Sequence, residues 1–231
     1  MSKMGYNWRQ LFGIVLGGAY VLGVSCATAQ ITPDRTLPNN SSVTINGSVF
    51  NITGGTQAGR NLFHSFQQFS VPTGGTASFN NGLDIQNIFS RVTGGAVSNI
   101  DGLIRANGVA NLFFLNPNGI VFGSNAQLNV GGSFVGSTAN AIQFGTQGIF
   151  SASIPDKSTP LLTINPSALL FIQINPGMIT NQSLAPAGVD LTGSFVTGLR
   201  VPDGNSLLLV GGNKYSRKIN CILLKGACKI Y

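Results

Sequence analysis

The sequence predicts an all-β, single-domain protein, and the architecture it favours is a parallel β-helix. Glycine pairs at 54–55, 74–75 and 94–95 recur every 20 residues inside similar phrases, ITGGT, PTGGT and VTGGA. Repeats of this length are typical of stacked coils, none of which can bury its apolar face alone. Only 8% of the residues are charged, which suits turns built from ladders of uncharged polar side chains. Hairpins packed as a sandwich are the alternative, because Asn-Gly and Asp-Gly are also common hairpin turns.

Residues 1–29 have the three-part plan of a cleaved secretory signal. Lys3 and Arg9 make the start basic, residues 11–24 form an uncharged run, and small residues at 27–29 fit cleavage before Gln30. The run is shorter than the roughly 20 residues of a membrane-spanning helix. Cys26 leaves a lipoprotein signal as an alternative, although Gly23 stands where that motif wants a branched apolar residue. The segment therefore predicts passage through the secretory translocon.

From residue 30 onward, short strand-like runs alternate with turn signals. Residues 49–52 and 85–92 combine β-branched and aromatic residues, and Asn-Gly or Asp-Gly pairs separate such runs. Residues 136–160 break this rhythm and are interpreted as an excursion from the helix or a distorted coil. Three later runs are predicted to extend the same stack: residues 161–164, residues 169–174 and Leu207–Val210.

The composition changes at residue 213. Residues 213–231 hold four of the six lysines and two of the three cysteines, and are predicted to be a premature or out-of-frame end. A basic cap over the last coil is the alternative. The tail carries five positive charges and the signal two, so the net charge of +7 leaves the body, residues 30–212, neutral. No nucleic-acid partner is expected, because such a partner needs clustered basic charge on the folded body.

The most informative stretch is NLFFLNPNGIVFG at 111–123, where a turn separates two apolar runs. Pro117 fixes its own φ, Asn118 tolerates a left-handed backbone, and Gly119 can adopt any positive φ that the turn still requires. The chain is therefore predicted to reverse sharply between two strands. On its own, such a motif is more typical of an ordinary tight turn than of a binding site.

Three blocks, in order, resemble the amino-terminal domain of filamentous-haemagglutinin-like exoproteins, the secretion domain of two-partner secretion systems. They are NLFHSFQQFSVPTGG (61–75), IQNIFSRVTGG (85–95) and NLFFLNPNGIVFGSNAQLNVGGSF (111–134), and the resemblance covers residues 30–212. The sequences of these blocks are most similar to those of cyanobacterial members. A second Asn-Pro motif that some members carry upstream of LNPNGI is absent, and IQNIFSRV stands in its place.

The resemblance implies a right-handed parallel β-helix with a task in export. In that family, the periplasmic domains of an outer-membrane transporter recognise the extended domain, and folding outside begins from it. Recognition by strand addition suits the apolar and aromatic segments at residues 61–71 and 111–122, although each residue in them is equally well explained as a core residue. The protein is expected to be secreted or held at the cell surface, by way of the periplasm, with its receptor unidentified. The residues expected to serve transporter recognition and fold nucleation are Asn116, Pro117, Asn118, Gly119, Ile120, Phe63, Phe66, Phe69, Ile88 and Phe89.

Catalytic and metal-binding patterns are missing from the sequence. His64 is the only histidine, the aspartates of the body are scattered singly, and glutamate is absent. A metal site needs several such ligands, so no metal or cofactor is expected, and neither is enzyme activity. Ser65 is expected on the opposite strand face from His64, which is interpreted as a partly buried packing or hydrogen-bonding residue. The alternative function, a surface β-helix that binds or processes polysaccharide, fits the dispersed charges poorly.

Overall fold

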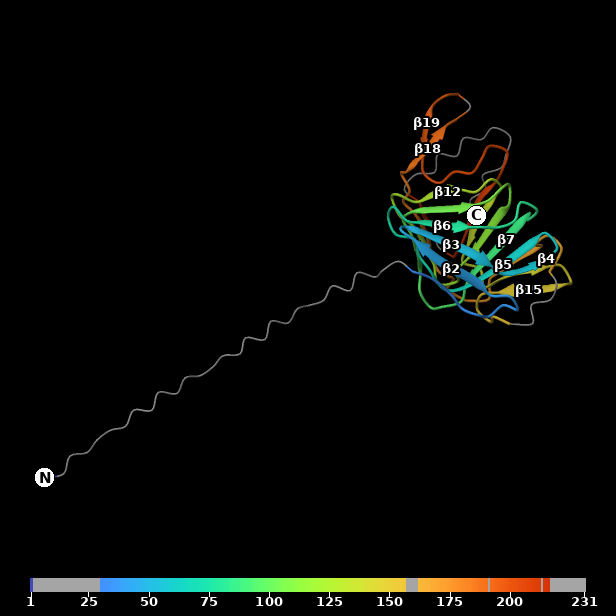
Figure 1. The fold of residues 1–231 in the computed structure, drawn as a ribbon, viewed down its shortest axis with the longest axis horizontal. Helices are drawn as coiled ribbons and strands as arrows, with labels where there is room; N and C mark the ends of the chain where they lie inside the picture. The colour runs from blue at the N-terminus through green and yellow to red at the C-terminus, as the bar shows by residue number, and fades with distance from the viewer. Residues whose placement is uncertain (2–29, 157–161, 191, 213, 217–231) are drawn as a thin grey trace.

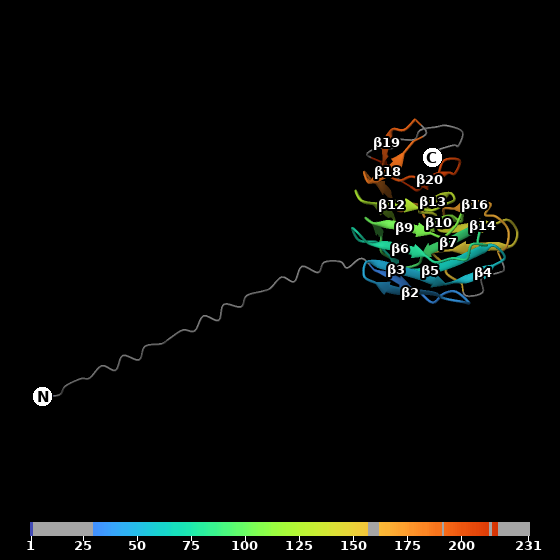
Figure 2. The ribbon, with the colours of Figure 1, turned by 45° about the horizontal axis from the view of Figure 1, so that its top comes forward.

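The computed structural model describes residues 1, 30–156, 162–190, 192–212 and 214–216. Every regular element in these ranges is a β-strand, and the strands stack into a coil (Figures 1 and 2). No helix of the described residues is long and apolar enough to cross a membrane. The predicted signal cleavage, the lipidation alternative at Cys26 and most of the predicted tail lie outside the described residues.

Three sheets of parallel rungs form the walls of the coil. Sheet A contains β5 (Asn61–Phe69), β7 (Asn87–Val92), β10 (Asn111–Leu115), β13 (Phe134–Ser137) and β20 (Leu207–Val210). Sheet B contains β3 (Val49–Gly54), β6 (Thr76–Phe79), β9 (Leu103–Ala106) and β12 (Gln127–Asn129). Sheet C contains β8 (Ser98–Ile100), β11 (Ile120–Phe122), β17 (Ile179–Asn181) and β21 (Lys214–Ser216).

From β6 to β12 the chain visits the sheets in the repeating order B, A and C, and each of these strands pairs in parallel with its equivalent in a neighbouring coil. This arrangement confirms the predicted parallel β-helix. The ladder of sheet C continues through β21 to Ser216, just beyond the predicted domain end at Gly212.

Antiparallel strands cover the first rungs of sheets A and B. β1 (Ile31–Pro33) and β4 (Thr56–Ala58) pair with β5, and β2 (Ser41–Asn46) pairs with β3. The two-residue turn between β2 and β3 is Gly47-Ser48, where Gly47 supplies a φ of 58°. Together these strands form an N-terminal cap that gives hydrogen-bond partners to edges that would otherwise stay open.

The coils are longer than the glycine spacing predicted. Asn61 pairs with Asn87, 26 residues later, and Asn87 pairs with Asn111, 24 residues later. The three glycine pairs do not stack on one another, because 54–55 lies at the end of a rung of sheet B, 74–75 precedes one and 94–95 follows a rung of sheet A. The prediction of 20-residue coils was therefore wrong.

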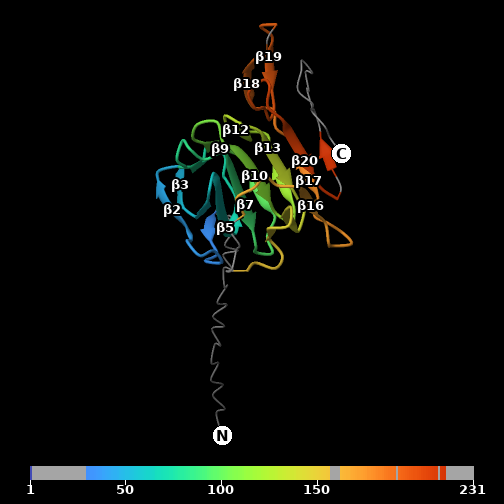
Figure 3. The ribbon, with the colours of Figure 1, turned by 90° about the vertical axis from the view of Figure 1, so that its right-hand side faces the viewer.

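Residues 141–151 leave the helix, as one of the two interpretations of residues 136–160 predicted, although Gly136 and Ser137 still belong to β13 of the stack. β14 (Ala141–Phe144) pairs antiparallel with β15 (Gly148–Ser151) and with β16 (Ala168–Leu170), and these three strands form the excursion sheet. The prediction that residues 161–164 and 169–174 extend the stack was wrong, since only Leu207–Val210 does so. A hairpin of β18 (Pro186–Val189) and β19 (Phe195–Thr197) projects beyond the end of the stack (Figure 3).

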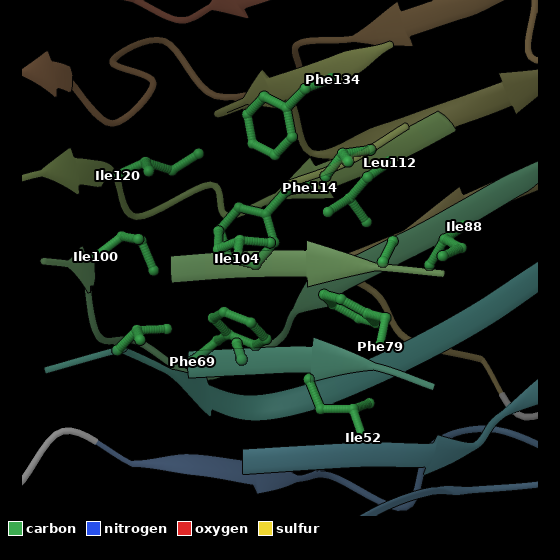
Figure 4. Close-up of a cluster of buried hydrophobic side chains, with 14 of the residues drawn as sticks. Ile52, Phe69, Phe79, Ile88, Ile100, Ile104, Leu112, Phe114, Ile120 and Phe134 are labelled. Atoms are coloured by element: carbon green, nitrogen blue, oxygen red, sulfur yellow. The ribbon is translucent and has the colours of Figure 1, made fainter. Parts of the chain in front are cut away.

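Apolar side chains from all three sheets fill the inside of the coil (Figure 4). Ten that are at most 1% exposed are Ile52, Phe69, Phe79, Ile88, Ile100, Ile104, Leu112, Phe114, Ile120 and Phe134. A second cluster lies on the outer face of sheet A, where the excursion sheet covers Phe63 and Phe89. Their rings stack with centroids 5.1 Å apart, and Phe144 and Phe150 of the excursion sheet pack edge-on against Phe63. Sheet A is thus buried on both faces, which explains its nearly continuous apolar runs.

Candidate transporter-recognition site

The Asn116–Gly119 turn joins β10 of sheet A to β11 of sheet C. These two strands pair with different neighbours, β10 with β7 and β13, and β11 with β8 and β17. The turn is therefore a corner of the coil. The predicted sharp reversal was wrong, because the strands on either side belong to different walls.

Asn116 is the buried centre of this corner, with none of its surface exposed. Its Nδ2 donates to the Ala96 carbonyl (3.0 Å) and to Ser98 Oγ (2.9 Å), both in the coil below. Its Oδ1 accepts the backbone N–H of Asn118 (3.0 Å), which closes the turn. One side chain thus shapes its own corner and ties it to the preceding coil, in the manner of an Asx turn.

The rest of the turn stacks between neighbouring corners. Asn118 is exposed, and its Nδ2 donates to the Gly94 carbonyl of the coil below (2.6 Å). The Pro117 carbonyl accepts the N–H of Gly177 in the coil above (3.0 Å). Gly119 has the predicted positive φ, 128°. Asn118 does not have one: among the described residues other than glycine, only Arg35 has a φ above zero.

The predicted aromatic and aliphatic residues divide between the two sides of sheet A. Phe66, Phe69 and Ile88 point into the coil, whereas Phe63 and Phe89 point outward beneath the excursion sheet. Nine of the ten predicted recognition residues are buried, and Asn118 is the exception. The folded chain therefore gathers these residues into two cores and a corner, and does not assemble them into one surface.

A ladder of asparagines runs along the beginning of the sheet A strands. Asn87 Nδ2 donates to Asn61 Oδ1, and Asn111 Nδ2 donates to Asn87 Oδ1, each at 2.9 Å. Asn61 Nδ2 in turn donates to the carbonyls of Leu162 and Ile164 (2.7 and 2.9 Å). This is the predicted kind of ladder, and it also attaches the part of the excursion that precedes β16.

His64 lies inside the coil and is 1% exposed, which is deeper than predicted. Its Nδ1 is 3.0 Å from Ser41 Oγ, and its ring packs near Phe66 and Phe79. Burial lowers the pKa of His64 to about 3, so the ring is neutral at physiological pH. Ser65 points to the opposite face of the strand, as predicted, where its hydroxyl meets Asp34 (2.7 Å).

The sequence reasoning missed Arg91, which is 1% exposed and the largest fully buried side chain of the described residues. Its signal was present in NIFSRV, where a single cation interrupts a run of strand residues. Such a cation is buried only when polar partners surround it. Those partners come from segments far away in the sequence, so the run alone could not name them.

Two features of the described residues bear on catalysis, the grouping of possible metal ligands and the lining of a groove. No three side chains of His, Cys, Asp or Glu among them group closely enough to hold a metal ion. A groove of about 350 Å³ lies between β12 and the base of the β18–β19 hairpin, and Arg200 is the one charged residue of its lining. Arg200 donates to the carbonyls of Ala187 and Val189 and to Asp203. Glycoside hydrolysis uses a pair of carboxylates, and no carboxylate lines this groove.

A model of the TPS secretion domain family matches residues 29–222, most of the chain. The chain belongs to this family. TPS secretion domains target exoproteins to an outer-membrane partner transporter for secretion across that membrane, so this chain is a secretion-targeting domain. The identification agrees with the family resemblance that the sequence predicted, and the cyanobacterial type stays a prediction.

A solved structure shows the same fold as this TPS secretion domain. The crystal structure of the HMW1 secretion domain from Haemophilus influenzae matches with a TM-score of 0.52 and 19% identity, over 81% of this chain and 41% of that chain. The crystal structure of a filamentous hemagglutinin secretion domain matches with a TM-score of 0.48 and 18% identity, over 79% and 63%. This chain therefore spans less than two thirds of either relative. No curated protein matches it.

Proposed function

We propose that this TPS secretion domain targets an adhesin-like exoprotein for secretion and nucleates its folding, and that its transporter reads it while it is extended. The route runs through the secretory translocon into the periplasm, where the periplasmic domains of the transporter bind the unfolded segment. The protein then folds outside the cell and is released or stays at the surface. It acts without catalysis of its own.

The burial of the predicted recognition residues is the observation that carries this proposal. Phe66, Phe69 and Ile88 are inside the coil, and Phe63 and Phe89 lie beneath the excursion sheet. In the folded state, the backbones of β5 and β7 are also paired on both sides. A partner that binds by strand addition needs free backbone groups and accessible alternate side chains. Only the extended chain offers both.

The same segments suit a folding nucleus. β5, β7 and β10 are consecutive rungs of sheet A, and their outward phenylalanines form a continuous stack. The ring centroids of Phe63 and Phe89 are 5.1 Å apart, and those of Phe89 and Phe113 are 4.8 Å apart. Once these rungs pair, the last one presents an ordered edge for the next coil.

The test compares binding to folded and unfolded chains. The probe is the purified periplasmic region of the cognate outer-membrane transporter. One ligand is the folded mature protein, and the other carries Phe114→Asp, which places a charge in the core and keeps the chain unfolded. The proposal expects binding to the unfolded variant that is at least tenfold tighter.

The controls locate the recognised segment. In the unfolded background, Phe66→Ser with Phe69→Ser should weaken binding, whereas Phe144→Ser with Phe150→Ser should not. The second pair removes the same number of buried rings from outside the predicted segments. Equal binding of folded and unfolded chains, or equal loss with both pairs, would show that the transporter does not read these residues in the extended chain.

A further inference from the structure

The guanidinium of Arg91 joins three separate parts of the fold. Its Nε donates to Ser65 Oγ within sheet A (2.8 Å). Its Nη1 donates to the carbonyl of Ser151, at the end of the excursion sheet (2.7 Å). Its Nη2 donates to the carbonyl and the hydroxyl of Thr36, in the N-terminal cap (3.2 and 2.9 Å). The Phe150 ring completes the enclosure, with its centroid 4.4 Å from Cζ.

Asp34 balances this buried charge through shared hydroxyl groups. Its carboxylate accepts hydrogen bonds from Ser65 (2.7 Å), Thr93 (2.6 Å) and Thr36 (2.8 Å). Ser65 and Thr36 therefore each bond to both Asp34 and Arg91. Burial alone raises the pKa of Asp34, but the hydrogen bonds from Thr93, Ser65 and Thr36 outweigh it and hold the pKa below 3.8.

Arg91 remains a cation in this enclosure. Burial lowers its pKa to about 10, against the opposing effect of the carboxylates of Asp34 and Asp156. A buried guanidinium is stable only while its N–H groups keep their acceptors. Its acceptors come from both the N-terminal cap and the excursion sheet, two segments that Arg91 connects from opposite sides.

We propose that Arg91 is a latch that makes closure of the N-terminal cap and docking of the excursion sheet depend on each other. If the excursion sheet lifts away, Arg91 loses the Ser151 carbonyl and the Phe150 ring and becomes open to water. Water then competes for its bonds to Thr36, which weakens the cap. In the same way, opening of the cap weakens the docking of the excursion sheet, because linkage between two sites is reciprocal.

The latch couples two segments that are far apart in the sequence. Asp34 and Thr36 lie near the beginning of the body, whereas Phe150 and Ser151 follow more than 100 residues later. The cap and the excursion sheet therefore reach their full stability only together. This inference concerns the folded chain alone and holds whether or not the transporter reads the extended segment.

Hydrogen exchange on the purified mature protein tests the latch from both sides. Thr36→Val removes the hydroxyl in the cap, and Phe150→Leu removes the ring in the excursion sheet. We expect each substitution to speed amide exchange about tenfold in both β1 and β15, because loss of one hydrogen bond to a charged group, or of one cation–π contact, changes a local opening equilibrium by about that factor. Thr44→Val, at an exposed position on β2, is the matched control and should change neither.

Arg91→Lys keeps the charge but cannot reach all of these acceptors together. In this background, Thr36→Val should affect only β1 and Phe150→Leu only β15. The proposal is overturned if, in the wild-type background, each substitution speeds exchange only on its own side. It is also overturned if the effects still cross from one side to the other when Arg91 is lysine.

Discussion

Replacing Asn116 by alanine should destabilise the folded domain by about 2 to 3 kcal/mol. The side chain is fully buried and takes part in four hydrogen bonds that alanine cannot replace. It donates to Ala96 and Ser98, and it accepts from the backbone N–H and the side-chain amide of Asn118. A typical bond contributes about 1 kcal/mol net, and polar groups left buried without a partner add to the cost. The change also empties the space of a buried amide, for which the surrounding corner has no substitute.

Asn118→Ala is the informative comparison, because the two asparagines share a turn but differ in burial. Asn118 is exposed, and its Nδ2 donates to the Gly94 carbonyl and to Asn116 Oδ1. Its φ is not positive, so alanine adds no backbone strain at this position. We expect a loss of about 0.5 to 1 kcal/mol, and about 3 kcal/mol for the double variant.

Urea unfolding of the purified mature chain measures these effects as shifts in midpoint at an unchanged m-value. Asn129→Ala, at an exposed position of β12, controls for the loss of an asparagine and should stay within about 0.5 kcal/mol of wild type. Secretion should be measured with the transporter co-expressed. If Asn116→Ala is as stable as Asn129→Ala and is secreted normally, the corner has no special weight in folding or export.

Two further predictions concern pH and export. The pKa of His64 is about 3 in the folded state and 6.5 without burial, so the unfolded state binds more protons between these values. Stability should therefore be complete above pH 6.5 and fall on acidification, by about 2 kcal/mol from pH 7 to pH 5. His64→Gln should remove this loss, and an unchanged urea midpoint of the wild type between the two pH values would contradict the argument. Mass spectrometry of the exported protein should find Gln30 as the amino terminus, and a lipid on Cys26 would exclude the proposed cleavage.

Local patterns in the sequence determined the strands, the turns and the family. Residues 85–92 and 111–123 were correctly predicted as strand and turn segments, because β-branched side chains, glycine and proline each restrict or extend the backbone conformations available at their own position. The asparagine ladder was also predictable in kind, since amides that stack in a coil can pair with one another. These features depend on a residue and its immediate neighbours, and the printed sequence contains both.

The length of each coil was decided by the tertiary structure. Corners and extra strands set the separation between stacked residues, so Asn61 meets Asn87 and not the residue 20 positions later. The same applies to residues 168–170, which have the composition of a coil strand but pair with β14 outside the helix. Parallel rungs are joined by long connections, and no local pattern fixes the partner on which a rung lands.

The burial of single polar residues was also decided in three dimensions. His64 and Arg91 occupy neighbouring rungs of sheet A, yet one faces the apolar interior and the other faces a polar enclosure. Strand alternation determines which face each residue takes, but the distant segments that cover that face decide its environment. For Arg91 those segments begin at Asp34 and end at Ser151, and their side chains meet only when the coil, the cap and the excursion sheet are all in place.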